Sequence, residues 1–128
     1  MKQVDSGDFI KAWGGIASLE LSLRAVWTDA VVRGSSLADI VRWMSEGPAG
    51  LSGLDARKGA IKPGADADLV LFDPDCHATV SGAALWQRHK LTPYDGRVLR
   101  GAVGATYVGG VNVWRDGSLV HARRGRLL

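Results

Sequence analysis

The apolar residues of the first quarter of the chain follow a helical spacing. They recur every three or four positions and therefore share one face of a helix; they are Ile16, Leu19, Leu23, Val26, Trp27, Ala30 and Val31. We expect this helix to end at Arg33 and Gly34, where a cation stands in the last turn and glycine can adopt the left-handed cap. The pattern predicts one helix with one buried face.

A second helix is predicted to begin after Ser36. Asp39 follows three residues later, which is the spacing of a capping box. The apolar stripe behind this cap consists of Leu37, Ile40, Val41 and Met44. We expect Gly47 and Pro48 to break the helix, and Pro48 to start a short third helix, because the N–H that proline lacks would be unpaired there.

After Leu54 the pattern changes to short apolar runs separated by turn residues. Residues 68–73 are rich in strand formers and lie between the Pro63–Gly64 pair and Pro74, which predicts a buried strand. The sequence thus divides into a mostly helical region, residues 1–54, and a β-rich region, residues 55–128.

The end of the chain predicts a meander of strands. Residues 105–108 and 111–114 flank Gly109 and Gly110, a pair that tolerates the positive φ angles of a two-residue hairpin turn. A second turn at Asp116 and Gly117 adds a strand at residues 118–120.

Composition excludes several classes of partner. The 46% hydrophobic content of the 128 residues is that of an ordinary globular protein, and no run approaches the roughly 18 apolar residues of a membrane span. The net charge is +3, and the basic residues cluster only in the tail, at His121, Arg123, Arg124 and Arg126. We interpret this tail as a solvated strand, and we expect neither a nucleic acid nor a membrane as partner.

The chain offers few groups for chemistry. A single cysteine, Cys76, excludes an internal disulfide and favours a cytoplasmic protein. It cannot act with His77, because neighbouring residues of a strand point to opposite faces. His77, His89 and His121 are far apart, with no His-x-His pair and no second cysteine. We therefore assign no catalytic residue and no metal ligand within the chain.

One segment resembles a part of the metal-dependent amidohydrolases. Residues 59–73 are similar to the strand, turn and strand that follow the catalytic barrel in that superfamily. Here Pro63 and Gly64 supply the turn, and we expect Asp66 and Asp68 to bond to local backbone groups.

Further segments resemble one family of cyclic amidohydrolases, the allantoinases, in residues and spacing. They are residues 5–9, 12–18, 41–49, 91–97 and 124–128, so the resemblance covers nearly the whole chain. One departure is Arg24, where the family pattern leads us to expect proline.

The resemblance implies an α/β plus β fold: the last helices of a TIM barrel, followed by part of a companion β-sandwich. The complete enzyme would open the ring of allantoin with a hydroxide held by zinc or another divalent metal pair. It would be a homo-oligomer. All metal ligands of the family would precede Met1, so we expect the chain alone to bind no metal and to be inactive.

One functional element of the family falls within the chain. The resemblance implies that the backbone of Gly14 and Gly15 contacts the substrate ring, because residues without a side chain permit close approach. Alternatively, the two glycines only end a loop and start a helix. At the level of the whole chain, two other hypotheses remain: a piece of a dihydropyrimidinase or hydantoinase, and a non-catalytic β-rich assembly or interaction module.

Overall fold

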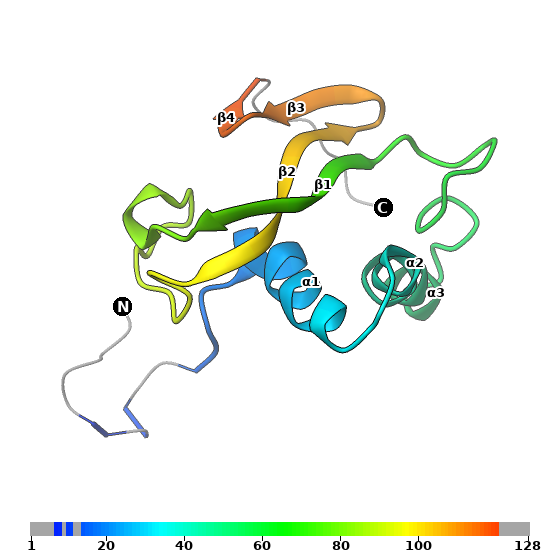
Figure 1. The fold of residues 1–128 in the computed structure, drawn as a ribbon. Coiled ribbons are helices and arrows are strands. Elements are labelled where there is room, and N and C mark those ends of the chain that lie inside the picture. Colours follow the sequence, from blue (N-terminus) through cyan, green and yellow to red (C-terminus); the bar gives the residue numbers. More distant parts are fainter. Residues whose placement is uncertain (1–6, 9, 12–13, 121–128) are drawn as a thin grey trace.

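A computed structural model describes residues 7–8, 10–11 and 14–120 of the chain. Helical elements come first and a four-stranded antiparallel sheet follows, with strand order β1-β2-β3-β4 (Figure 1). The helical elements are η1 (Leu19–Leu21), α1 (Ser22–Val32), α2 (Leu37–Val41), η2 (Arg42–Glu46) and α3 (Gly47–Leu51). The sheet region contains β1 (Leu69–Thr79), η3 (Gly82–Ala84), β2 (Val98–Val108), β3 (Val111–Arg115) and β4 (Ser118–Leu119). No helix of the described part is long and apolar enough to span a membrane.

The first predicted helix is confirmed as α1, although it begins later than its apolar stripe. Trp27 and Ala30 are buried, whereas Ile16 lies before the helix and Leu19 is 91% exposed. The 3-10 turn η1 precedes α1 and has three residues per turn, so it shifts the buried face to Leu21. The helix ends as expected, with Gly34 at a φ of +80°.

The predicted capping box is confirmed. Asp39 N–H donates to Ser36 Oγ at 3.3 Å, and Ser36 N–H donates to Asp39 Oδ2 at 2.9 Å. Ile40 behind this cap is buried against Trp27 and Ala30 of α1, so the cap directs α2 back onto α1.

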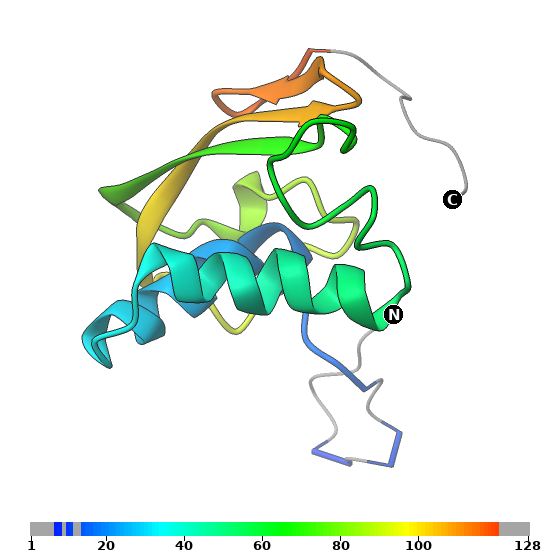
Figure 2. The same ribbon diagram turned by 90° about the vertical axis from the view of Figure 1, so that its right-hand side faces the viewer.

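The third helix expected at Pro48 is present as α3, with Pro48 in its first turn, but the break expected before it is absent. α2, the π-helical turn η2 and α3 form one continuous rod, which Figure 2 shows beside α1. Gly47 N–H donates to Arg42 O, five residues back, instead of to the carbonyl four residues back. This wider turn accommodates Pro48, because a proline ring clashes with the carbonyl four residues earlier in a regular helix.

The strand predicted at residues 68–73 is confirmed as β1, but it is longer and less buried than expected. Only Phe72 of its apolar run packs against the α1 core, and Leu71 is 56% exposed. The apolar run predicted burial, yet Leu69 and Val70 are also 36% and 51% exposed. The strand expected before the Pro63–Gly64 turn is absent from residues 59–62, although the turn itself forms with Gly64 at a φ of +85°.

The hairpin between β2 and β3 is confirmed. Gly109 and Gly110 have φ angles of +56° and +79°, as a two-residue turn of this kind requires. The second turn has Asp116 at +46° and Gly117 at +85°, and β4 follows it. β2 extends back to Val98, well beyond the predicted residues 105–108.

The ladder between β1 and β2 is interrupted by a large bulge. Asp73 pairs with Ala102 and His77 pairs with Arg100, so residues 74–76 of β1 face only Gly101 of β2. Gly101 has a φ of +90°, and a Cβ at this position would lie 2.1 Å from Phe72 Cζ. The bulge therefore requires glycine for its backbone angle and for its lack of a side chain.

Helix α1 is hydrogen-bonded to this bulge. Pro74 O accepts hydrogen bonds from Trp27 Nε1 at 2.9 Å and from Arg100 Nε at 3.0 Å. Thr28 Oγ1, one residue along α1, accepts from Arg100 N–H at 2.8 Å. The position of the helix on the sheet is thus set by directional bonds as well as by apolar packing.

We expect Gly101→Ala to lower the free energy of unfolding by about 3 kcal/mol, since alanine resists the positive φ and overlaps Phe72. Denaturant titration measures this change. Gly104→Ala is the matched control, because Gly104 has no positive φ and its nearest described atom, Leu71 O, would be 4.0 Å from the added Cβ. Equal losses in the two variants would contradict the role given to Gly101.

Candidate functional site

The two candidate substrate-binding glycines lie in an exposed loop that leads into η1. Gly15 has a φ of +78°, which favours glycine. A Cβ placed on Gly14 or on Gly15 would meet no described atom within 4 Å beyond the chain neighbours. Among the described atoms, the space beside the Cα of each glycine is therefore unfilled. Trp13, which precedes it, lies outside the described residues.

The segment after the two glycines is held by groups from the β-rich region. Thr92 Oγ1 donates a hydrogen bond to Ala17 O at 2.7 Å. Trp86 N–H donates to the carboxylate of Glu20 at 2.7 Å. Residues 82–97 therefore fix the course of the chain from the loop into α1.

Arg24, where the resemblance led us to expect proline, joins α1 to both long strands. Its Nη2 donates to Ala78 O of β1 at 3.0 Å and to Leu99 O of β2 at 3.3 Å. Proline cannot make either bond, so in this chain the substitution adds a link between the helix and the sheet.

An apolar groove of about 690 Å³ lies between η1, the start of α1 and the sheet. Its walls include Leu19, Leu23, Val70, Val103, Trp86 and Trp114. The polar side chains at its edge are few, so it resembles an unfilled packing surface more than a site for a polar reaction.

The remaining candidate groups do not assemble into a reactive centre. Cys76 lies half-buried in the β1 bulge, and the next residue, His77, is exposed. Within the described residues no group of three or more His, Cys, Asp or Glu side chains is placed to hold a metal ion. The tail with His121, Arg123, Arg124 and Arg126 lies outside the described residues.

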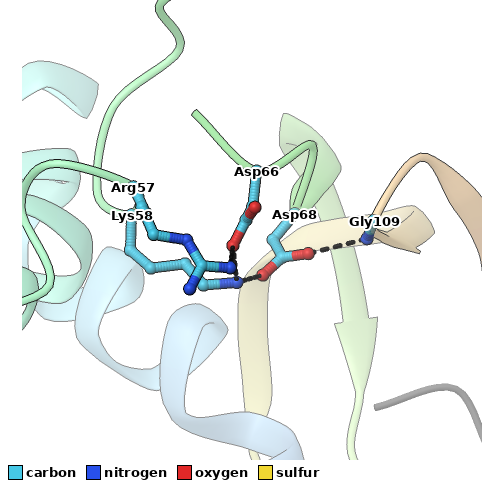
Figure 3. A network of polar contacts seen from close by, with 5 residues as sticks. All are labelled: Arg57, Lys58, Asp66, Asp68 and Gly109. Atoms are coloured by element: carbon cyan, nitrogen blue, oxygen red, sulfur yellow. Dashed lines mark hydrogen bonds and ion pairs between the residues drawn. The ribbon is translucent and has the colours of Figure 1, made fainter. Parts of the chain in front are cut away.

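An ion-pair network, missed in the sequence, joins the loop after α3 to the β2–β3 hairpin (Figure 3). Lys58 Nζ contacts the carboxylates of Asp66, at 3.0 Å, and of Asp68. Arg57 adds a contact to Asp66 at 2.8 Å. The expectation that both aspartates bond to local backbone was wrong, because their carboxylates bind the side chains of Lys58 and Arg57.

The same network secures the hairpin turn. Asp68 Oδ1 accepts from Gly109 N–H at 2.7 Å (Figure 3). Ala67 O accepts from Gly110 N–H at 2.8 Å. Both amides of the turn are thereby bound by the segment that enters β1. These hydrogen bonds could not be predicted from the spacing of residues, since Asp68 and Gly109 are 41 positions apart.

The network changes the acidity of its members. Hydrogen bonds from Lys58 hold the pKa of Asp66 and that of Asp68 below the usual range. The hydrogen bond to Asp68, and then that to Asp66, raises the pKa of Lys58. All three groups are therefore charged throughout the neutral range.

Comparison with known proteins gives a family for the chain. The model of the amidohydrolase family matches residues 3–113. An allantoinase of Streptomyces avermitilis is 50% identical over 94% of this chain and 27% of its own length. An allantoinase of Saccharomyces cerevisiae is 39% identical over 91% of this chain and 24% of its own length. The resemblance to allantoinases is confirmed.

Several solved structures that resemble this chain are titled hydantoinases. The L-hydantoinase (dihydropyrimidinase) of Arthrobacter aurescens has a TM-score of 0.82 and 36% identity, covering 89% of this chain and 26% of the other. The D-hydantoinase of a Thermus species has a TM-score of 0.80 and 32% identity, covering 88% and 25%. The chain thus spans about a quarter of the length of the proteins it matches.

We expect Lys58→Met to lower the thermal midpoint of unfolding at about pH 7. Because the folded pKa values of Asp66 and Asp68 are lowered, their pairing stabilises the fold above the unfolded pKa, near about 3.9. This stabilisation is lost as the pH falls through the lower folded pKa values. The difference between the original chain and Lys58→Met should therefore shrink as the pH is lowered from about 7 to about 3.

Lys62→Met is the control for this experiment, because Lys62 is a nearby exposed lysine that bonds only the backbone oxygen of Asp55 among the described groups. Its midpoint should stay close to that of the original chain at each pH. A loss in Lys58→Met that persists unchanged in acid would show that the ion pairs are not its cause.

Proposed function

The chain belongs to the amidohydrolase family, and we propose that it is the C-terminal portion of a metal-dependent enzyme that hydrolyses a cyclic amide, allantoin. The observation that carries this proposal is the continuous similarity to allantoinases, at 50% identity over 94% of the chain in one case. Similarity of this extent includes the loop at Gly14 and Gly15 and the segment around Thr92, which contact each other through Ala17.

We propose that residues 1–54 are the end of a TIM barrel and that residues 55–128 are part of its companion β-sandwich. The order of elements supports this division, because the described α-helices end at Leu51 and the first strand begins at Leu69. The exposed apolar face of β1 also supports it. A sandwich needs a second layer on such a face.

We assign the metal ions to the part of the enzyme outside this chain. A zinc pair, or another divalent pair, would lower the pKa of a bound water and polarise the amide carbonyl. The described residues offer no cluster of ligands that fits such a pair. The contribution of this chain is binding: the main chain at Gly14 and Gly15 would contact the ring.

We further propose that the complete enzyme is a cytoplasmic homo-oligomer. Trp43 and Trp86 are 49% and 59% exposed, and large aromatic side chains on a surface favour contact with another subunit or segment. The lone cysteine is in keeping with a reducing compartment.

The second candidate function is hydrolysis of hydantoins or dihydropyrimidines. It is favoured by the structural match to the Arthrobacter hydantoinase, which extends over 89% of the chain. The two candidates share a reaction and differ in substrate. A non-catalytic module is the third reading, and coding sequence in front of Met1 with a His-x-His motif would exclude it.

We expect the complete protein, supplied with a divalent metal, to hydrolyse allantoin faster than hydantoin or a dihydropyrimidine. The 128-residue chain should hydrolyse none of them and should bind no stoichiometric zinc, because a stable zinc site needs three or four convergent ligands. Assays of both proteins with all three substrates, together with metal analysis, measure this. A preference for hydantoin would replace the first candidate by the second.

We also expect the 128-residue chain to self-associate through its uncovered groove. Leu19→Gln should weaken association by about tenfold, since a buried leucine contributes roughly 1.5–3 kcal/mol. Leu51→Gln is the matched control: Leu19 and Leu51 are 91% and 92% exposed, and only Leu19 lines the groove. Sedimentation gives the result, and equal effects of the two substitutions would exclude the groove as the contact surface.

A further inference from the structure

Thr92 is the one polar residue that is buried in the described part of the chain, with 5% of its surface exposed. Its hydroxyl donates to Ala17 O at 2.7 Å and accepts a longer bond from Tyr94 N–H at 3.4 Å. A buried hydroxyl costs free energy unless it is hydrogen-bonded. The Thr92 hydroxyl meets this requirement by contacting a loop 75 positions earlier in the sequence.

The base from which Thr92 projects is a tight turn with many internal bonds. Asp95 N–H donates to Thr92 O at 3.3 Å, and Arg97 N–H donates to Tyr94 O at 2.9 Å. The carboxylate of Asp95 accepts from Gly82 N–H at 2.7 Å. The main chain that carries the Thr92 side chain is therefore held by hydrogen bonds outside the loop that the hydroxyl contacts.

This turn is also joined to the hydrophobic core. Val80 N–H donates to Arg97 O at 2.9 Å, and Val80 O accepts from Gly96 N–H at 2.9 Å. Val80 is buried with Leu21, Leu85 and Leu99 in one apolar cluster. The Thr92 hydroxyl thus connects the loop to one of the best-packed regions of the described chain.

On the other side of this bond lies the loop that contains Gly14 and Gly15. Ala17 lies two residues after Gly15, and glycine has more backbone freedom than any other residue. A fixed point at Ala17 O limits the arrangements that Gly14 and Gly15 can adopt. Ser18, the next residue, then starts η1, with Leu21 N–H donating to Ser18 O at 2.9 Å.

We propose that Thr92 is a positioning residue, which holds the main chain of Gly14 and Gly15 in the arrangement that binds substrate. The assignment rests on the proposed function for the contact between these glycines and the cyclic amide. Thr92 acts through Ala17 and does not touch the ring. Its loss should weaken substrate binding and leave the chemical step intact, which raises KM more than it lowers kcat.

The test uses Thr92→Val in the complete protein, because valine keeps the shape of threonine and lacks the donor. We expect KM for allantoin to rise about tenfold with kcat changed by less than about twofold. Thr92→Ser restores the hydroxyl and should return KM close to its original value. Amide exchange of residues 14–18 should be faster in Thr92→Val than in Thr92→Ser.

Thr28→Val is the matched control. Thr28 Oγ1 donates to Arg24 O at 2.7 Å and accepts from Arg100 N–H at 2.8 Å, so the variant loses comparable buried bonds away from the loop. It should leave KM and the exchange of residues 14–18 unchanged. If it raises KM as much as Thr92→Val does, a general loss of stability explains both results and the proposal is overturned.

Failure of the proposed function has a separate signature. If the complete protein hydrolyses no cyclic amide, amide hydrogen exchange of residues 14–18 still tests whether Thr92 fixes the loop. Equal exchange rates in the Thr28→Val and Thr92→Val variants would show that it does not. If the complete protein is active and Thr92→Val keeps its KM, only the positioning role fails. Should the Thr92→Val protein not fold, Thr92→Ala gives the same comparison without placing an added methyl group in the polar position.

Discussion

The carbonyl of Pro74 accepts two hydrogen bonds, and the arrangement of the helices on the sheet depends on them. The bulge in β1 leaves this carbonyl without a strand partner, and an unpaired carbonyl at such a junction costs free energy. Trp27 and Arg100 satisfy it, and the Arg100 guanidinium lies 5.9 Å from the centre of the Trp27 ring. Because Gly101 permits the bulge, the position of α1 on the sheet depends on this glycine and on the Pro74 carbonyl.

The position of α1 determines where the elements that precede and follow it in the sequence lie. At its C-terminal end the chain turns at Gly34, and the Ser36 cap returns Ile40 to the core around Trp27. At its N-terminal end, Leu21 enters a second core with Leu99, which places η1 and the preceding loop beside the sheet. Both apolar cores beside α1 thus include a residue of the sheet, Phe72 in one and Leu99 in the other.

The features that sequence reasoning predicted are those decided by neighbouring residues. The Ser36 cap and the Gly109–Gly110 turn depend on contacts between residues close in sequence, and both were confirmed. Lys58 could not be predicted as a partner of Asp68, nor Thr92 as a partner of Ala17, because only the folded chain brings them together. At the candidate site, Gly14 and Gly15 were assigned from the family resemblance, and a contact of either with substrate remains a prediction.

A binding loop made of consecutive glycines gains close approach to its ligand and loses definition of its own path. Contacts from neighbouring segments supply part of this definition and so lower the ordering cost of binding. Here it comes from residues 82–97, through Thr92 at Ala17 and through Trp86 at Glu20. Under the proposed function, the β-rich region therefore takes part in substrate binding without a catalytic group of its own. Separated from that region, the helical part would keep its two glycines and lose the geometry that makes them a site.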